Sequence, residues 1–210
     1  DAATLKTIAD AAREVGVLLI CDEIAVNFGR TGTLFAHAQA GIAPDIICLG
    51  KALTGGAINL AATVATADVF DAFLSDRADA ALMHGPTYMA SPLACAAANA
   101  SLDLFDTEPR LQQVAAIEVQ LKRELAPLAA LPGVTDVRVK GAIGTVQVSA
   151  LHNLDWLKAQ FVEAGIWLRP FGNVIYTMPP YTVTPAELSA ITGAIAEILP
   201  RWAALESDAP

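Results

Sequence analysis

The sequence predicts an α/β layered domain followed by a small α+β domain, and three observations support this prediction. Two short runs, VLLICDEI (17–24) and DIICLGKAL (45–53), are apolar on both faces, as strands covered by helices are. After residue 134 the apolar residues alternate instead, which is typical of antiparallel strands. Of the 210 residues, 54% are apolar and 17% are charged, which indicates a globular chain rather than a disordered one. We expect the boundary between residues 1–106 and 107–210.

In the first part, helical and strand patterns alternate. Strands that follow helices this closely favour parallel pairing in a layered α/β domain. Gly16 is expected to end the first helix, because glycine readily adopts the left-handed backbone at that position. The expected elements are a helix over 4–16, a strand over 17–24, a Gly-rich loop over 27–36, a strand over 45–53, a strand and then a helix within 60–74, and a loop from 84 that becomes a helix at about 91.

In the second part, a long helix leads into an antiparallel unit. Pro109 predicts a break near residues 107–109, because proline cannot continue a helix without losing a hydrogen bond. Thr184 and Glu187 form a capping-box pattern at the start of the last helix. The expected elements are helices over 111–128, 155–165 and 184–199, two strands within 134–149, and a hairpin over 166–180 that turns at Phe171-Gly172-Asn173. Trp156, Trp167 and Trp202 are expected in the core or in an interface.

Composition excludes several classes of function. The formal net charge is −9 and no basic run occurs, which argues against nucleic-acid binding. No apolar run reaches the roughly 18 residues that a membrane span requires. Cys21, Cys48 and Cys95 lack metal-ligand spacing, and their odd number does not indicate a disulfide framework. We therefore expect no metal site, reduced buried thiols and a cytoplasmic protein.

Asp22 and Lys51 are the residues whose positions point to chemistry. Asp22 lies at the carboxyl end of one predicted buried strand and Lys51 just past the carboxyl end of the next, and ligands of open α/β sheets bind at that edge. An aspartate and a lysine at one edge can hold a pyridine ring, the carboxylate on the ring N–H and the amine as a Schiff base. Each signal alone is weak: a strand-end aspartate often caps a turn, a lone lysine is often solvated, and an Asp-Glu pair could bind a metal or act as a Walker B acid. No Gly-Lys-Ser/Thr phosphate loop supports the nucleotide alternative.

Four blocks of the sequence favour the interpretation that Asp22 and Lys51 bind a cofactor with a pyridine ring. They are CDEIAVNFGRTG (21–32), PDIICLGKALTGG (44–56), HGPTYMASPLACAAANASL (84–102) and WLRPFGNVIYTMPPY (167–181). Together they resemble class III aminotransferases of pyridoxal 5′-phosphate (PLP) fold type I, the aspartate-aminotransferase-like fold. The resemblance implies that residues 1–106 are the C-terminal part of a PLP-binding large domain and residues 107–210 a small C-terminal α+β domain.

The resemblance also implies roles for individual residues. Lys51 resembles the Schiff-base lysine and Asp22 the carboxylate paired with the pyridine nitrogen. Pro86 and Thr87 match a loop that reaches the cofactor phosphate of a neighbouring subunit, and Gly85 of the same loop would approach substrate. Arg169 resembles the arginine that binds a substrate carboxylate, and Tyr176 is a weaker candidate for substrate contact. His37 and His152 belong to no such constellation.

The last two blocks resemble the branch of the family that acts in biotin biosynthesis. That branch would imply transfer of the amino group of S-adenosylmethionine to 8-amino-7-oxononanoate, giving 7,8-diaminononanoate, in a homodimer with shared active sites. Two alternatives stay open: another class III ω-aminotransferase with a different amine donor, or an inactive fragment that serves only as a dimerisation module. Comparing S-adenosylmethionine with simple amines as donors would distinguish the first alternative from the biotin enzyme. A PLP titration of this chain with size-exclusion chromatography would distinguish the second alternative from an enzyme.

The sequence departs from the family pattern in two ways. Val26 and Asn27 stand where a Thr-Gly or similar small pair is usual, beside the expected cofactor edge. The chain also corresponds only to the C-terminal half of such an enzyme. A sheet without its early strands would expose edges and apolar faces, so we expect this polypeptide alone to be poorly active.

Overall fold

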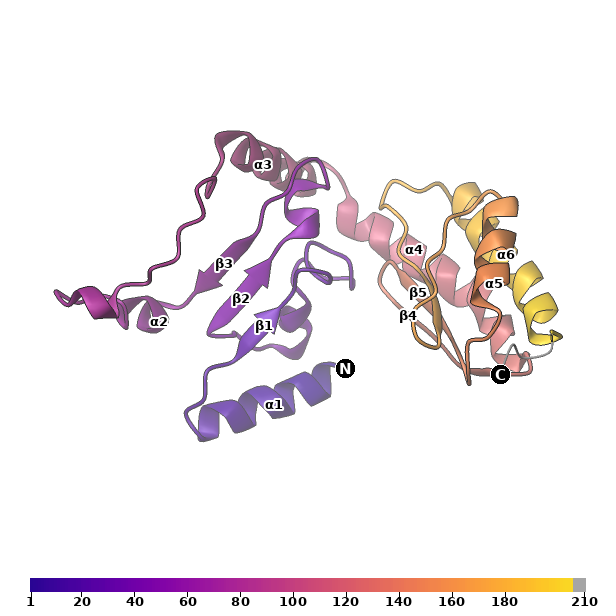
Figure 1. Cartoon of the computed structure of the whole chain (residues 1–210), viewed down its shortest axis with the longest axis horizontal. Coiled ribbons are helices and arrows are strands. Elements are labelled where there is room, and N and C mark those ends of the chain that lie inside the picture. Colours follow the sequence, from indigo (N-terminus) through magenta and orange to yellow (C-terminus); the bar gives the residue numbers. More distant parts are fainter. Residues whose placement is uncertain (206–210) are drawn as a thin grey trace. The chain divides into compact units, whose positions relative to one another are not determined.

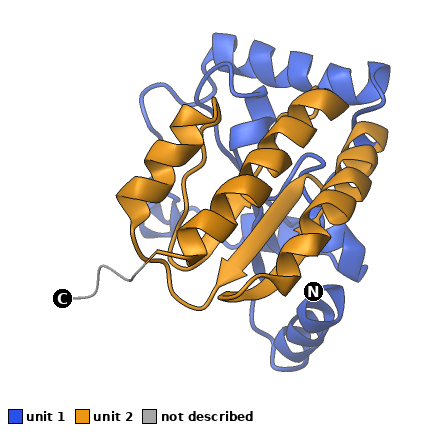
Figure 2. Ribbon diagram, turned by 90° about the vertical axis from the view of Figure 1, so that its right-hand side faces the viewer, with its two compact units in different colours: residues 1–111 blue, residues 112–210 orange. Residues whose placement is uncertain are grey.

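The computed structural model describes residues 1–205 and shows two compact units, residues 1–111 and residues 112–210 (Figure 2). The division between them falls a few residues after the boundary expected from the sequence. It lies just inside the helix α4, Arg110–Leu125, so that helix belongs almost entirely to the second unit. No helix among residues 1–205 is long and apolar enough to cross a membrane.

The first unit combines a small sheet with helices and short 3-10 turns (Figure 1). The expected strand over 17–24 is regular only over its last part, and the helix expected over 4–16 begins and ends two residues earlier. Its helices are α1 (Ala2–Glu14), α2 (Ala67–Asp71) and α3 (Pro92–Thr107), its strands are β1 (Ile20–Asp22), β2 (Ile46–Leu49) and β3 (Ala62–Ala65), and its 3-10 turns are η1 (Ala36–Ala40), η2 (Lys51–Thr54) and η3 (Ala78–Ala80).

The sheet of the first unit has the order β1-β2-β3. β1 and β2 are parallel, with Asp22 opposite Cys48, as the alternation of helix and strand predicted. β3 runs antiparallel to β2, so the expectation of parallel pairing is wrong for this strand. The physical reason is the short connection from β2: the chain passes through η2 and a turn at Gly55-Gly56, both with positive φ, and returns beside β2 without a crossover helix.

Two small cores stabilise the first unit. One lies between α1 and β1 and contains Ala9, Cys21, Ala40 and Ile42. The other lies between β2, η2 and α3 and contains Phe28, Leu49, Leu53 and Ala98. Large apolar side chains also remain at the surface beside β1, with Val17, Leu18 and Ile20 all more than half exposed. This agrees with the exposed apolar faces expected from the sequence.

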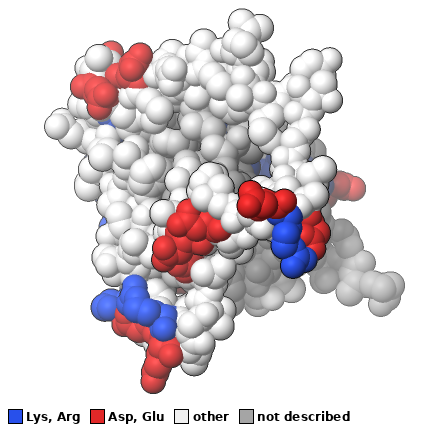
Figure 3. All heavy atoms as spheres, turned by 90° about the vertical axis from the view of Figure 1, so that its left-hand side faces the viewer, with Lys and Arg blue, Asp and Glu red and all other residues white. Residues whose placement is uncertain are grey.

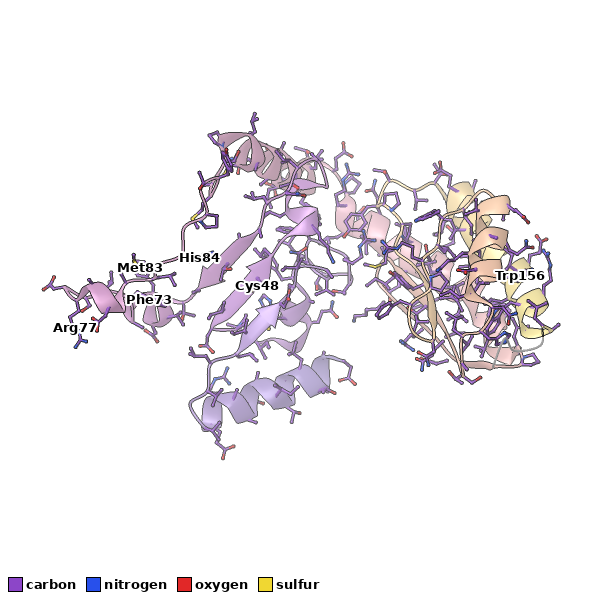
Figure 4. All side chains as sticks on the ribbon, in the orientation of Figure 1. Cys48, Phe73, Arg77, Met83, His84 and Trp156 are labelled. Carbon is purple, nitrogen blue, oxygen red and sulfur yellow. The ribbon has the colours of Figure 1, made fainter. Side chains whose placement is uncertain are left out.

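The segment between β3 and α3 stands away from the sheet (Figure 1). It includes α2 and η3 and returns to α3 through an irregular stretch, where Phe73, Arg77, Met83 and His84 lie along the projection (Figure 4). Met83 is 91% exposed and Tyr88 is 87% exposed. Viewed from the side of this projection, most of the surface carries neither Lys, Arg, Asp nor Glu (Figure 3).

The second unit is an antiparallel sheet packed with three helices. The order β4-β5-β6 places the strand after Asn173 against β5. The hairpin predicted over 166–180 is therefore wrong: residues 166–170 form no strand, and only an isolated bridge joins Phe171 to Val174. Besides α4, the elements are β4 (Val134–Lys140), β5 (Ile143–Val148), α5 (Leu154–Glu163), β6 (Val174–Thr177), α6 (Pro185–Ala203) and the 3-10 turn η4 (Ala126–Ala130).

One continuous core fills the space between this sheet and its helices. Leu121 of α4, Phe161 of α5 and Ile175 of β6 are fully buried. Gly144 allows α4 to lie directly on β5, because a Cβ at that position would lie 2.8 Å from a methyl carbon of Leu125. Such a clash could be relieved only by moving the helix or its side chains.

Helix ends in the second half follow the sequence signals closely. α3 ends at Thr107 and α4 begins at Arg110, so the break predicted at Pro109 is confirmed. The capping box is also confirmed: Thr184 Oγ1 accepts from the Glu187 N–H at 3.2 Å, and Glu187 accepts from the Thr184 N–H at 2.8 Å. The Glu187 carboxylate accepts from the Thr184 N–H and, at 2.8 Å, from the Thr184 hydroxyl, and these two hydrogen bonds, the backbone one first, lower the pKa of the Glu187 carboxyl.

Candidate active site

Asp22 and Lys51 lie at the same edge of the first unit's sheet. Asp22 is the last residue of β1 and is in register with Cys48 of the parallel strand β2. Lys51 follows the end of β2 by two residues and begins η2. Both side chains are exposed, and Asp22 Oδ1 accepts a hydrogen bond from the Ile24 N–H at 3.1 Å. The edge formed by the carboxyl ends of parallel strands is where ligands bind in such sheets.

The backbone at Lys51 is strained. Lys51 has φ of +46°, a left-handed conformation that costs free energy for a residue with a Cβ and is concentrated at functional sites. Gly50 before it is fully extended, and a Cβ there would lie 3.3 Å from a side-chain carbon of Ile24. Glycine at 50 therefore lets the chain pass close to the Asp22 loop and turn sharply into Lys51.

Hydrogen bonds from neighbouring elements hold this turn. The Leu53 N–H donates to the Gly50 carbonyl at 3.0 Å, and Ser101 of α3 donates its hydroxyl to the Ala52 carbonyl at 3.2 Å. Leu53 is itself buried in the small core beside α3. The strained lysine is thus fixed on both sides, which is the condition under which such a conformation persists.

The loop after Asp22 is anchored by a buried carboxylate. Glu23 is 3% exposed and accepts from the N–H groups of Ala36 and His37, each at 2.7 Å, while His37 Nδ1 lies 2.8 Å from Glu23 Oε1. Reasoning from the sequence gave His37 no constellation and missed this pair. The two residues are fourteen positions apart in an irregular loop, and no periodicity relates them.

The cysteines show no reactive environment. Burial, with a smaller contribution from the charge of Glu23, raises the pKa of the Cys21 thiol, which disfavours the nucleophilic thiolate. Cys21, Cys48 and Cys95 are all free thiols. Within residues 1–205, no group of three or more His, Cys, Asp or Glu side chains is arranged to hold a metal ion.

Gly85, Pro86 and Thr87 lie in the irregular return from the projecting segment to α3, and all three are exposed. A turn follows them, in which the Met89 N–H donates to the Pro86 carbonyl at 2.9 Å. The loop thus offers its backbone and the Thr87 hydroxyl to the surroundings, which suits binding of an anion. The role of these residues toward a cofactor stays a prediction.

Arg169 and Tyr176 line one pocket of the second unit, of about 560 Å³. Arg169 is exposed and comes from the irregular segment after α5, and Tyr176 is half-buried on β6 opposite Thr145. The rest of the lining is mainly apolar, formed by Ile166, Trp167, Leu168, Met178, Pro179, Pro180, Ala190 and Ile191 together with Gly165, Thr177 and Glu187. One guanidinium in an apolar wall suits a ligand with a carboxylate on an aliphatic chain.

Trp167 belongs to this pocket and not to the core. It is 77% exposed and lies two residues before Arg169, so of the two positions expected from the sequence, core or interface, the core is excluded and the interface stays a prediction. Trp202, by contrast, is 2% exposed and donates its indole N–H to the His152 carbonyl at 2.7 Å, which confirms a core position there. The residue type alone does not show that Trp202 is buried and Trp167 is exposed. The spacing of Trp167 and Arg169, two residues apart in an extended segment, could have indicated that both side chains lie on one face.

Comparison with protein families identifies the family of this chain. The model of the class III aminotransferases matches residues 1–199. The chain belongs to the class III aminotransferase family. Its curated relatives include proteins named adenosylmethionine-8-amino-7-oxononanoate aminotransferase from Corynebacterium glutamicum, at 45% identity over 195 residues, and from Mycobacterium leprae, at 47% over 194 residues.

The same comparisons show how much of such an enzyme the chain represents. The two alignments cover 93% and 92% of this class III aminotransferase chain, but 46% and 44% of the relatives. The chain therefore spans about half the length of the curated relatives it matches. All of the active-site residues proposed from the sequence lie within the matched range.

Solved structures agree with this assignment. An amine transaminase from an uncultivated Pseudomonas species, solved in a PLP-bound internal-aldimine form, superposes with a TM-score of 0.89 at 32% identity. The adenosylmethionine-8-amino-7-oxononanoate aminotransferase of Methanocaldococcus jannaschii superposes with a TM-score of 0.84, also at 32% identity. They cover 96% and 98% of this chain and 48% and 49% of their own, so the predicted fold class, PLP fold type I, is confirmed.

Proposed function

We propose that the complete protein is a PLP-dependent aminotransferase of biotin biosynthesis. It transfers the amino group of S-adenosylmethionine to 8-amino-7-oxononanoate and gives 7,8-diaminononanoate. The observation that carries the proposal is the pair Asp22 and Lys51 at one sheet edge, with Lys51 held in a strained turn. The names of the curated relatives, at 45% and 47% identity, support the choice of substrates.

The residues of this edge fit PLP. When bound, PLP supplies an electron sink that stabilises negative charge on the carbon next to the substrate nitrogen. Lys51 would hold the cofactor through its Nζ, and its amine would be the group that moves a proton at the substrate carbon. Asp22, an exposed carboxylate at the end of β1, would accept a hydrogen bond from the ring nitrogen of the cofactor and favour its protonated form.

A second copy of the chain completes the site in this proposal. Gly85, Pro86 and Thr87 lie on an exposed loop next to a projecting segment rich in exposed apolar side chains, including Phe73 and Met83. Such surface is typical of protein interfaces. We assign Thr87 and Pro86 to the cofactor phosphate of the neighbouring subunit and Gly85 to close approach of substrate, in a cytoplasmic homodimer.

The pocket of the second unit binds the keto acid. Arg169 pairs with the carboxylate of 8-amino-7-oxononanoate through two charge-assisted hydrogen bonds. The apolar wall formed by residues such as Met178 and Ile191 takes up the aliphatic chain of the acid. Tyr176, in the same wall, adds an aromatic face and a hydroxyl.

The test of the cofactor assignment is Lys51→Ala in the complete protein with added PLP. We expect loss of the visible absorbance band of lysine-bound PLP and loss of turnover by several orders of magnitude, since the nucleophile and proton carrier are removed together. Lys6→Ala, on the exposed face of α1 and paired with Asp10, is the matched control and should keep both. If Lys51→Ala keeps the band and full turnover, the proposal is wrong.

The donor assignment needs a separate measurement. The structural similarity to an amine transaminase favours a second candidate, an ω-aminotransferase that uses simple amines. Turnover of 8-amino-7-oxononanoate with S-adenosylmethionine should exceed turnover with simple primary amines at equal concentration. A preference for simple amines would show that S-adenosylmethionine is not the donor, but it would not affect the role proposed for Lys51.

A further inference from the structure

Asn27 is a buried polar side chain that the proposed reaction does not use. It is 1% exposed, in the loop that follows Asp22. Its Nδ2 lies 3.5 Å from the Gly50 carbonyl oxygen, a long hydrogen bond, and its Oδ1 is buried with no hydrogen-bond partner among residues 1–205. Burying an unpaired acceptor destabilises the folded state, so the presence of an amide here calls for a reason.

The backbone around Asn27 is fixed to the strand that carries Asp22. The N–H groups of Val26 and Asn27 both donate to the Glu23 carbonyl, at 3.0 and 2.9 Å, and the Glu23 N–H donates to the Cys48 carbonyl at 3.0 Å. Asn27 itself is not in the left-handed region; the residue with positive φ is Phe28, at +46°. The side chain of Asn27 therefore projects from a rigid turn at the end of β1.

At its other end, Asn27 meets the residue before Lys51. The Gly50 carbonyl already accepts from the Leu53 N–H at 3.0 Å, and a carbonyl oxygen has two lone pairs, so the amide of Asn27 can occupy the second. This carbonyl belongs to the peptide that enters the strained Lys51 turn. A donor that fixes its direction restricts the rotation of that peptide and hence the direction of the lysine.

We infer that Asn27 is a positioning residue that ties the Asp22 loop to the Gly50 carbonyl and thereby holds the Lys51 turn in its left-handed conformation. Its amide joins the two loops that carry the proposed cofactor residues. Because the Nδ2 group faces Gly50, the Oδ1 atom is left buried without a hydrogen-bond partner among residues 1–205, and this is the energetic cost of the contact. The inference rests on the role proposed for Lys51, but the effect on the turn itself does not depend on PLP.

The decisive variant is Asn27→Leu, measured by amide hydrogen exchange in the complete protein without cofactor. Leucine has the same branching and number of heavy atoms, with neither a donor nor an unpaired acceptor, so the gain from removing the buried oxygen should offset the slightly larger methyl groups and the thermal midpoint should stay nearly the same. The Leu53 amide should nevertheless exchange about three- to tenfold faster, because the Gly50 turn opens more often. Thr31→Val is the matched control: Thr31 is a buried polar residue of the same loop, and its hydroxyl lies 3.5 Å from the Val26 carbonyl and accepts from the Gln39 side chain at 3.2 Å.

A second readout follows the lysine with PLP bound. The pH midpoint of the visible absorbance should move in Asn27→Leu and stay in place in Thr31→Val. If Asn27→Leu does not fold, Asn27→Asp keeps the size and replaces the donor by an oxygen that repels the Gly50 carbonyl; the expected changes in Leu53 exchange and in the absorbance midpoint are the same, but the thermal midpoint should fall because a carboxyl is buried without a partner. Equal Leu53 exchange in the Asn27 variant and in Thr31→Val would overturn the inference, whereas a retained absorbance band in Lys51→Ala would overturn only the proposed function.

Discussion

Trp167 carries a prediction about substrate binding at the scale of a single residue. Its exposed indole lines the pocket that holds Arg169, where it can cover an aliphatic chain. Trp167→Ala should raise the KM for 8-amino-7-oxononanoate about tenfold, which corresponds to the loss of about 1.4 kcal/mol of apolar contact, with a smaller change in kcat. Steady-state kinetics with the keto acid as the varied substrate measures this.

Two controls define the outcome for Trp167. Trp167→Phe retains an aromatic face and should restore most of the affinity. Val162→Ala removes apolar surface from an exposed position of α5 that does not line the pocket, and should change neither parameter. A KM that is equal in Trp167→Ala and Val162→Ala would exclude the indole from the substrate pocket.

Single residues also show how far the sequence alone could lead. Asp22 and Lys51 could be placed at one sheet edge, because strand ends and chain direction are readable from the pattern. The contact of Asn27 with the Gly50 carbonyl could not be predicted, because it joins two irregular loops twenty-three residues apart. The left-handed φ of Lys51 could not be predicted from the sequence either, because a lysine gives no local signal for that conformation.

At the scale of elements, Glu124 links α4 to α6. Its carboxylate accepts from the hydroxyls of Ser189 at 2.9 Å and Thr192 at 2.6 Å, and Arg123 lies 2.7 Å away. Burial raises the pKa of this carboxyl, but the hydrogen bonds from Thr192 and then Arg123 and Ser189 outweigh it, so the pKa lies below its usual value of 4.5. The ionised form therefore favours the folded state.

This linkage predicts the pH dependence of stability. As the pH falls, the unfolded chain protonates Glu124 first, so the contribution is full above about pH 4.5 and is lost as the pH falls through the lower folded pKa. Glu124→Gln should lower stability at pH 7 by about 1 kcal/mol and make the loss of stability in acid shallower. Urea unfolding between pH 3 and 7 measures both effects.

Glu118→Gln is the control for Glu124. Glu118 lies on the same helix and pairs with Lys122 one turn later; the Lys122 side chain is 57% exposed and that of Glu118 is 24% exposed. Pairs along one helix that reach solvent contribute little, so stability should change by less than about 0.5 kcal/mol at any pH. Equal acid profiles for the two variants would show that the contacts of Glu124 with α6 do not stabilise the second unit.

The elements show which sequence signals are dependable. The capping box of α6 and the break at Pro109 depend on local chemistry, and both were predicted correctly. The direction of β3 and the pairing partner of β6 depend on which strand lies alongside, and both predictions were wrong. β6 pairs with β5, which is separated from it by α5, so the turn residues at Phe171-Gly172-Asn173 did not reveal its partner.

At the scale of the whole molecule, the two units differ in how completely they bury apolar surface. The core residues of the second unit are at most 5% exposed, whereas those of the small core beside α1 are 4–9% exposed. Val15, Val17 and Leu18, between α1 and β1, are 71%, 60% and 58% exposed. Because burial of apolar area is the main source of stability, the second unit should be the more stable one in this chain.

Amide hydrogen exchange on the 210-residue chain tests this difference directly. The amides of β5 and β6 should be protected at least about tenfold more strongly than those of β1 and β2, because opening of the second unit breaks a larger core. In the complete protein, whose relatives are about twice as long as this chain, additional polypeptide that covers the apolar face beside β1 should raise the protection of β1 and β2 and leave β5 and β6 nearly unchanged. Equal protection of both sheets in the 210-residue chain would mean that the exposed side chains do not limit the stability of the unit that carries Asp22 and Lys51.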